Sequence, residues 1–279
     1  MDSDSEAEAI MADTIPETVP EFLREVLLLM TEPYKVQVFR GQSNKEWKPL
    51  PTLYRRLIEN GYDDSEITEP LVKAYETDIF CESNGLGFYE GNRLSTMIKL
   101  QHHGGATRLL DITRDLFVAL WFAVEDSKFD SKDGELICYS ADPSIVAENG
   151  TISTWDQVSS EIPPGEAIVF FPQTTEKRVK AQSAGFLASS IAGTLQEENI
   201  FCNGNEKLVK SSCSIKSGLK KDLRQYLQVS RGIHQYSLFP DFSGYAMSHS
   251  VSKQFPRSRG KLYDAQDGLV PTYFRFPID

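Results

Sequence analysis

The sequence predicts a single α+β domain in which helices and strands follow one another without a regular alternation. The chain has 279 residues, which is long for one domain and short for two. Hydrophobic residues make up 40% and charged residues 25%, so the chain can bury a sizeable core. Strand-like and helix-like segments are interleaved irregularly, which favours α+β over a doubly wound sheet.

The first elements of the domain are expected to be a helix and a strand. Residues 20–30 have a helical pattern with Pro20 in the first turn. Residues 34–39 alternate apolar and polar side chains, which indicates a strand that ends at Arg40 and Gly41. Three further helices are expected at residues 44–60, after an initial loop, at 68–82 and at 92–102.

The most apolar segment is residues 116–123, which is hydrophobic on all sides and predicts a buried helix packed against a sheet. Thr113 would cap its N-terminus. A helical period from Ile215 to Leu227 predicts a late helix that stops at Gly232. Short apolar runs predict strands at residues 134–140, 166–171 and 184–191, and residues 253–279 are expected to be extended.

The charge distribution predicts an acidic tail and a mildly acidic domain. The net charge is −11, and residues 1–20 hold six acidic residues without a lysine or arginine. We therefore expect a flexible tail at 1–17 and a domain at 18–279, with its core at about 34–250. An acidic body offers no broad surface to duplex nucleic acid. No membrane partner is expected, because no apolar run reaches the roughly 20 residues of a membrane span, and a cytoplasmic location is expected.

A first candidate site stretch begins at Arg40, Gly41 and Gln42 and continues to Arg55 and Arg56. An arginine at the end of a strand, beside a glycine, can point into a cleft, and the glycine would let a ligand approach the backbone. The guanidinium group presents a fork of donors that suits phosphate. The alternative is a surface arginine in an ion pair beside a turn glycine.

A second candidate stretch, residues 101–113, is rich in polar residues and glycine although it lies between two apolar helices. Binding residues are often placed on such loops. The alternative is a buried hydrogen-bond network in which Asp111 pairs with Arg108 or a histidine and Thr113 caps the next helix. His102 and His103 have no third ligand at a suitable spacing, so no metal is expected.

Together the two stretches resemble the FRG-domain family, which is named after its Phe-Arg-Gly start. The resemblance extends over about residues 20–250 through further pieces at Arg178, 181–186 and 238–241. His103 and the pair Gly105-Ala106 depart from the family pattern, but neither change removes a polar site group. The segments that carry the resemblance are Phe39-Arg40-Gly41-Gln42, Gln101-His102-His103-Gly104, Thr107-Arg108-Leu109-Leu110-Asp111-Ile112-Thr113 and Ala119-Leu120-Trp121-Phe122-Ala123.

The order of these motifs is similar to that of ADP-ribosyltransferases, which implies a split central sheet and NAD as co-substrate. The similarity places Arg40 on the first strand, Thr113 at the end of a strand and Gln182 where those enzymes have a glutamate. It implies catalytic roles for Arg40, Asp111, Thr113 and Gln182. It also implies contacts to NAD from Arg40, Gly41, Gln42, His102, His103, Thr107 and Arg108.

The expected function is an NAD-dependent ADP-ribosyltransferase, a glycosyltransferase that uses NAD, with a nucleic-acid or protein acceptor. Arg40 would hold phosphate, Thr113 or Thr107 would bond to the ribose, and a carboxylate would offset the positive charge that develops on it. Gln182 cannot offset charge, so Asp111 or Glu76 would have to, although a solvated helix face is the simpler expectation for Glu76.

Two other interpretations remain open. In the first, the same pocket belongs to a nucleotide- or nucleic-acid-binding module that does not turn its ligand over, in a phage-defence or stress system. In the second, the domain is a structural interaction domain whose polar loop is only a buried network.

Two sets of side chains have simpler explanations. Trp47, Trp121 and Trp155 are expected to be core or rim aromatics rather than a base-stacking platform. Basic residues around the late helix are expected to form a solvated face, and they mark the place where a nucleic acid would bind if it were the partner. They are Lys207, Lys210, Lys216, Lys220, Lys221, Arg224 and Arg231, with Arg257, Arg259 and Lys261 from the C-terminal segment.

Overall fold

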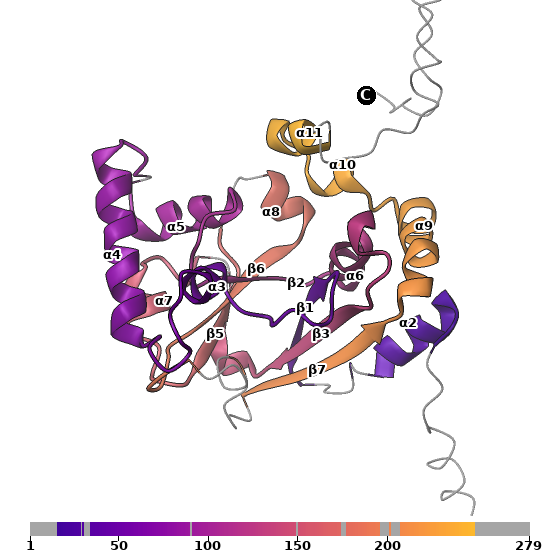
Figure 1. Ribbon diagram of the computed structural model, residues 1–279, viewed down its shortest axis with the longest axis horizontal. Helices are drawn as coiled ribbons and strands as arrows, with labels where there is room; N and C mark the ends of the chain where they lie inside the picture. Colours follow the sequence, from indigo (N-terminus) through magenta and orange to yellow (C-terminus); the bar gives the residue numbers. More distant parts are fainter. Residues whose placement is uncertain are drawn as a thin grey trace, which may run out of the picture.

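The central feature of the fold is one mixed seven-stranded sheet with helices on both faces (Figure 1). The computed structural model describes residues 16–28, 30, 34–89, 91–148, 150–173, 177–195, 201 and 207–248. Within these residues the predicted α+β class is confirmed. Most of the expected tail, residues 1–15, and the expected extended segment 253–279 lie outside the described part of the chain.

The sheet has the order β4-β5-β6-β2-β1-β3-β7, and its neighbouring strands are antiparallel except for the β4–β5 pair. Its strands are β1 (Val36–Gln42), β2 (Leu110–Thr113), β3 (Gly134–Ala141), β4 (Val146–Ala147), β5 (Ala167–Phe170), β6 (Ala184–Ser189) and β7 (Leu208–Ile215). The strand expected from alternation at 34–39 is confirmed as β1, and the three expected from apolar runs are confirmed as β3, β5 and β6. β7 was not expected, because it is an edge strand with few buried side chains and several serines.

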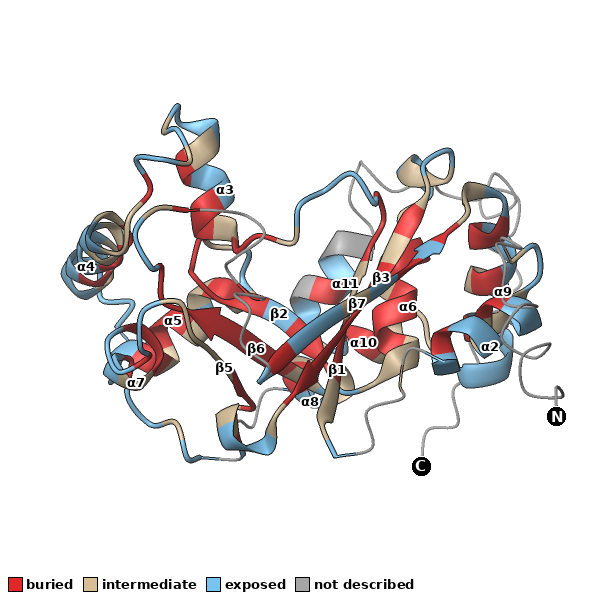
Figure 2. Ribbon diagram, turned by 90° about the horizontal axis from the view of Figure 1, so that it is seen from below, coloured by how far each residue is buried: buried red, intermediate tan, exposed pale blue. Residues whose placement is uncertain are grey.

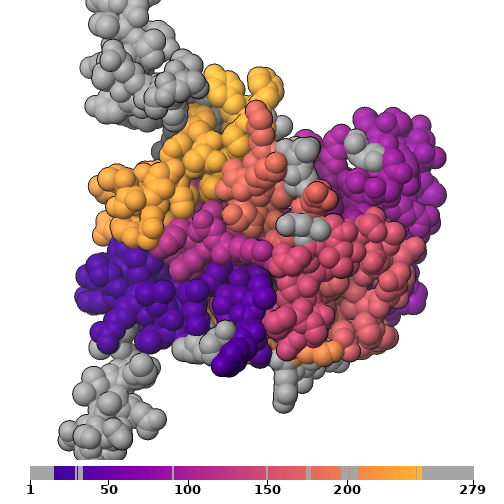
Figure 3. Space-filling view, turned by 180° about the vertical axis from the view of Figure 1, so that it is seen from behind, coloured from indigo at the N-terminus to yellow at the C-terminus, as the bar shows by residue number. Residues whose placement is uncertain are grey.

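The helices lie in two groups at opposite ends of the sheet (Figure 2). One group holds α4 (Glu69–Gly85), α5 (Arg93–His102) and α7 (Asp156–Ser159). The other holds α2 (Val19–Leu28), α6 (Leu116–Val124), α9 (Lys220–Arg231) and α10 (Gln235–Leu238), and α2 and α9 lie side by side within it (Figure 3). The remaining helices are α3 (Thr52–Glu59), α8 (Lys177–Ala181) and α11 (Phe242–Ser248).

Strand alternation divides the apolar side chains among three cores. Val38 and Ile112 pack with α3 and α4 in the first core. Phe39, the next residue after Val38, packs with α2, α6 and α9 in the second. Phe186 packs with α5 and α7 in the third. Because successive residues of a strand point to opposite faces, the side chains of Val38 and Arg40 leave β1 on one face and that of Phe39 on the other.

The sheet is nearly divided between β1 and β2. Their ladder consists of one residue pair, Phe39 with Thr113, whereas β1 and β3 share seven pairs. Continuing the same antiparallel register would set Gly41 opposite Asp111, but the strands do not pair there. Instead Nη1 of Arg40 donates a hydrogen bond to the carbonyl oxygen of Asp111 at 2.9 Å. The Arg40 side chain therefore spans the gap that opens where the two strands separate.

Helix α6 packs directly on β1 because residue 41 is a glycine. A Cβ atom on Gly41 would lie 1.8 Å from the carbonyl oxygen of Ala119, so no other residue fits without moving the helix. In the direction of a side chain, the room that this glycine leaves is filled by the backbone of α6.

The N-terminus of α6 is capped by Asp115, not by Thr113 as predicted. The Asp115 carboxylate accepts hydrogen bonds from the backbone N–H groups of Phe117 at 2.8 Å and Val118 at 3.3 Å. Thr113 instead connects the start of α6 to Gln182. Its hydroxyl accepts a hydrogen bond from the N–H of Asp115 and donates one to the carbonyl oxygen of Gln182 at 2.7 Å.

We expect Asp115→Ala to lower the free energy of unfolding by about 1 kcal/mol, the usual contribution of an N-cap side chain. Urea denaturation followed by far-UV circular dichroism measures this change. Asp115→Asn should lose much less, because the amide oxygen can still accept from the same N–H groups. Equal losses in the two variants would contradict the capping role.

Candidate functional site

A cavity of about 620 Å³ lies beside the junction of β1 and β2. Its volume falls within the range of about 300–1,000 Å³ that is usual for small-molecule sites. The cavity brings together eight of the residues that the sequence singled out, from segments far apart in the chain. They are Arg40, Gly41, Gln42, His102, His103, Asp111, Thr113 and Gln182.

Arg40 presents an incompletely paired guanidinium to this cavity. Its Nε is buried and has no hydrogen-bond partner among the described residues, and Arg40 forms no salt bridge within them. Burial lowers the pKa of Arg40, although the charge of Asp111 acts in the opposite direction. A guanidinium group in a partly buried place attracts an anion strongly, because water screens the attraction only weakly there.

A hydrogen-bond chain orients the carboxylate of Asp111. The N–H of Leu109 donates to Thr107 Oγ1 at 3.1 Å, and that hydroxyl donates to Gln101 Oε1 at 2.6 Å. Gln101 Nε2 then donates to Asp111 Oδ2 at 2.7 Å. The alternative prediction that Asp111 pairs with Arg108 or a histidine is corrected, because the side chain that donates to its carboxylate is Gln101.

Asp111 is open to solvent through the cavity although protein surrounds it on its other sides. Burial raises its pKa, while the charge of Arg40 and the hydrogen bond from Gln101 partly offset this effect. A ligand can therefore reach this carboxylate, and a carboxylate that is already oriented stabilises a positive charge placed next to it.

Thr113 and Gln182 line the cavity with polar groups that are already bonded to protein. The Thr113 hydroxyl donates to the carbonyl oxygen of Gln182. The amide nitrogen of Gln182 donates to the carbonyl oxygen of Leu238 at 3.1 Å. Both side chains thus tie β2 to the segments around α8 and α10, which favours positioning roles over the catalytic roles that the sequence suggested.

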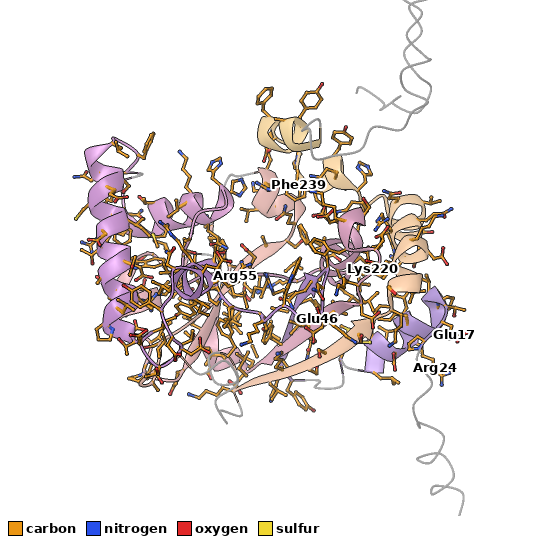
Figure 4. The ribbon with its side chains drawn as sticks, in the orientation of Figure 1. Glu17, Arg24, Glu46, Arg55, Lys220 and Phe239 are labelled. Atoms are coloured by element: carbon orange, nitrogen blue, oxygen red, sulfur yellow. The ribbon has the colours of Figure 1, made fainter. Side chains whose placement is uncertain are left out.

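Arg178 and Phe239 close another side of the cavity and were not predicted as site residues. Arg178 Nη1 donates to the carbonyl oxygen of His102 at 3.1 Å, and its guanidinium carbon lies 4.2 Å from the centroid of the Phe239 ring. His102 Nε2 lies 3.9 Å from Asp241 Oδ2. Phe239 is labelled beside α10 in Figure 4. The signal was present, since Arg178 and residues 238–241 belong to the pieces that carry the family resemblance.

Thr107 and Arg108 lie outside the cavity, which corrects their assignment to NAD binding. Arg108 is fully buried and donates to Glu76 from Nε at 2.6 Å and from Nη2 at 2.9 Å, and to Glu69 from Nη1 at 2.8 Å. Glu76 is 2% exposed, so the expected solvated helix face is also wrong. Burial is the largest single effect on the pKa of Arg108 and lowers it, but Glu76, Tyr54 and Glu69 together raise this pKa above its usual range.

Two further features, a metal site and a membrane-spanning helix, are absent from the described residues. Within the described residues, no group of three or more His, Cys, Asp or Glu side chains is arranged to hold a metal ion. In the same part of the chain, no helix has the length and apolar character needed to cross a membrane.

Comparison with known families identifies the segment that carries β1, β2 and α6. A family model described as the FRG domain matches residues 35–132. This span includes Arg40, Gln101 and Asp111, is shorter than the resemblance over 20–250, and ends before Arg178 and Gln182. No curated protein and no solved structure matches the chain. Residues 35–132 therefore match the model of the FRG-domain family, the family that the motifs predicted.

Proposed function

We propose that this protein is an NAD-dependent ADP-ribosyltransferase of the FRG type that acts on a nucleic-acid or protein acceptor. The observation that supports the proposal is a single cavity in which the cationic Arg40 and the oriented carboxylate of Asp111 both face a prospective ligand. Arg40 supplies donors for a phosphate, and Asp111 supplies negative charge for the ribose.

The proposed reaction breaks the bond between nicotinamide and C1 of its ribose. The bonding electrons leave with nicotinamide, which becomes neutral, so positive charge develops on the ribose. The acceptor's nucleophilic atom then forms a bond to C1 and releases its proton to solvent. Asp111 stabilises the developing charge because it is fixed in place by Gln101 before the reaction begins.

A second function has its own supporting observation. The hydroxyls of Thr107 and Thr113 donate to protein oxygens, and the position of the glutamate in ADP-ribosyltransferases is taken by Gln182, whose amide nitrogen is bonded to Leu238. With these groups committed to the fold, the cavity would bind a nucleotide without cleaving it. The protein would then be a nucleotide- or nucleic-acid-binding module.

Incubation with NAD labelled in its adenylate part separates the two functions. A transferase releases nicotinamide, detected by liquid chromatography, and labels one of the candidate proteins or nucleic acids offered to it. Calorimetry on the same preparation measures nucleotide binding. Tight binding without nicotinamide release would support the module and contradict the transferase.

The rate of NAD cleavage should fall as the pH drops through the pKa of Asp111, because the protonated carboxyl no longer offsets positive charge. Burial raises this pKa, so the fall should begin above the pH expected from an ordinary aspartate pKa of about 3.9. A pH–rate profile of kcat/KM measures it.

Asp111→Asn is the control for this prediction, and its residual activity should lack the acidic fall. Ionised Asp111 is unfavourable for the fold, since a raised pKa means that stability is lost as the pH rises through it. The variant should therefore be at least as stable as the wild type at neutral pH. An unchanged acidic fall in Asp111→Asn would exclude Asp111 as its cause.

A further inference from the structure

We propose that Arg40, Arg55 and Trp47 form a seat for a nucleoside diphosphate, with the two phosphates between the guanidinium groups and the base stacked on the indole. The proposal deepens the proposed function and rests on it for the choice of NAD as ligand. It places the adenosine diphosphate half of NAD on the side of α3, which leaves the nicotinamide ribose for Asp111. Arg55 and Trp47 lie in the first candidate stretch of the sequence, but neither was expected to contact NAD.

The charges of the cavity support an anion that carries more than one phosphate. Arg40 and Arg55 both line it, and neither forms a salt bridge among the described residues. The hydrogen bond of Arg55 is local, from Nη2 to Thr52 Oγ1 at 3.1 Å within α3. The charge of Arg55 contributes to lowering the pKa of Arg40, after the larger effect of burial, so the two cations lie within range of mutual repulsion. A diphosphate removes this repulsion because it neutralises both groups.

Trp47 differs from the other two tryptophans in its exposure. It is 44% exposed, whereas Trp121 is 4% and Trp155 is 3% exposed. Phe129 holds the indole from one side, with ring centroids 4.7 Å apart at an interplanar angle of 78°. Because Trp47 and Arg55 both line the cavity, an aromatic surface is available next to a cation, which is the combination that binds a nucleobase and its phosphates.

The loop that carries Trp47 is held in place by several hydrogen bonds. Gln42 Nε2 donates to the carbonyl oxygen of Trp47 at 3.0 Å. The N–H of Lys45 donates to the carbonyl oxygen of Asp133 at 2.8 Å. Lys220, expected on a solvated face, is instead buried, and its ammonium group donates to the carbonyl oxygens of Ser43 and Phe129. Figure 4 labels Lys220 and Arg55 on the two sides of this loop. A fixed loop lowers the entropy cost of binding.

A second hollow shares Trp47 with the cavity but differs from it in charge, which favours the cavity as the place for the phosphates. Trp47, Lys48 and Arg55 are common to both hollows. The second one is lined in addition by four carboxylate residues, Glu46, Glu59, Asp63 and Asp64. The main cavity has three carboxylates, Asp111, Glu125 and Asp126, but it also has two cations that the second hollow lacks, Arg40 and Arg178. Because carboxylates repel phosphate and cations attract it, a diphosphate held by Arg55 lies on the side of Arg40.

Binding of ADP to the full chain tests the seat without requiring catalysis. We expect ADP to quench tryptophan fluorescence, because Trp47 is the one well-exposed tryptophan of the described residues. Calorimetry should show that Arg55→Ala raises the Kd for ADP by about tenfold or more, the usual effect of losing a charge-assisted hydrogen bond. Trp47→Leu should abolish the quenching and raise the Kd at least about fivefold, and Trp47→Phe should recover part of the affinity.

Arg56→Ala is the matched control, because Arg56 is an exposed neighbour on the same helix that does not line the cavity. Its Kd for ADP should stay within about twofold of the wild type, and thermal unfolding establishes that every variant is folded. A wild-type protein that binds ADP but does not cleave NAD would support the seat and contradict the transferase. Cleavage of NAD with unchanged ADP binding in Arg55→Ala and Trp47→Leu, or no ADP binding by the wild type at millimolar concentration, would overturn the seat.

Discussion

Replacing Arg40 by alanine is expected to lower kcat/KM for NAD cleavage at least about a hundredfold while leaving the protein folded. Two charge-assisted hydrogen bonds to phosphate contribute roughly 1.5–3 kcal/mol each, which corresponds to a combined factor of about 10² or more. The stability cost should stay near 1 kcal/mol, because Arg40 gives the fold one hydrogen bond, to the carbonyl oxygen of Asp111. Nicotinamide release and urea denaturation measure the two effects separately.

Arg40→Lys distinguishes charge from geometry at this position. Lysine keeps the positive charge but lacks the planar fork that bonds phosphate through two nitrogen atoms, and it cannot span the gap to Asp111 in the same way. We expect activity between those of the wild type and of Arg40→Ala. Activity of Arg40→Ala within about threefold of the wild type would remove Arg40 from the site, and so would a loss explained entirely by unfolding.

Replacing Arg108 by alanine is expected to have the opposite signature, with a loss of about 3–5 kcal/mol of stability and little effect on the ligand site. The change leaves the carboxylate of Glu76, 2% exposed, without its bidentate partner. Nucleotide affinity of the folded protein should stay close to that of the wild type, because Arg108 does not line the cavity. Urea denaturation and calorimetry below the unfolding transition measure these two quantities.

A double variant, Arg108→Met with Glu76→Leu, tests whether the damage comes from the unpaired charge. Removing both charged groups should recover much of the stability, since apolar residues of similar volume often replace a buried ion pair without loss. If the double variant is less stable than both single variants and nucleotide binding is lost in all of them, the pair serves the site as well as the fold.

The secondary structure could be predicted in large part because its signals are local. The apolar pattern of residues 116–123 was sufficient for α6, and the strands β3, β5 and β6 follow from short apolar runs. The strand β7 was not predicted, because an edge strand buries few side chains and therefore shows little hydrophobic periodicity in the sequence. The pairing of Arg108 with Glu76 could not be predicted for another reason. Glu76 lies 32 residues away, and its burial depends on how α4 packs.

Local sequence patterns were enough to predict the α+β class and to find the motifs around Arg40 and Asp111, which lie within the match to the FRG-domain family model. Which of those motif residues line the cavity depends on the tertiary structure. Strand alternation directs Arg40 to the face of Val38, and Asp111, one residue before Ile112, to the opposite face. The two meet in one cavity because β1 and β2 pair at a single position and then separate. Such a separation depends on contacts among distant segments, so no local pattern in the chain records it.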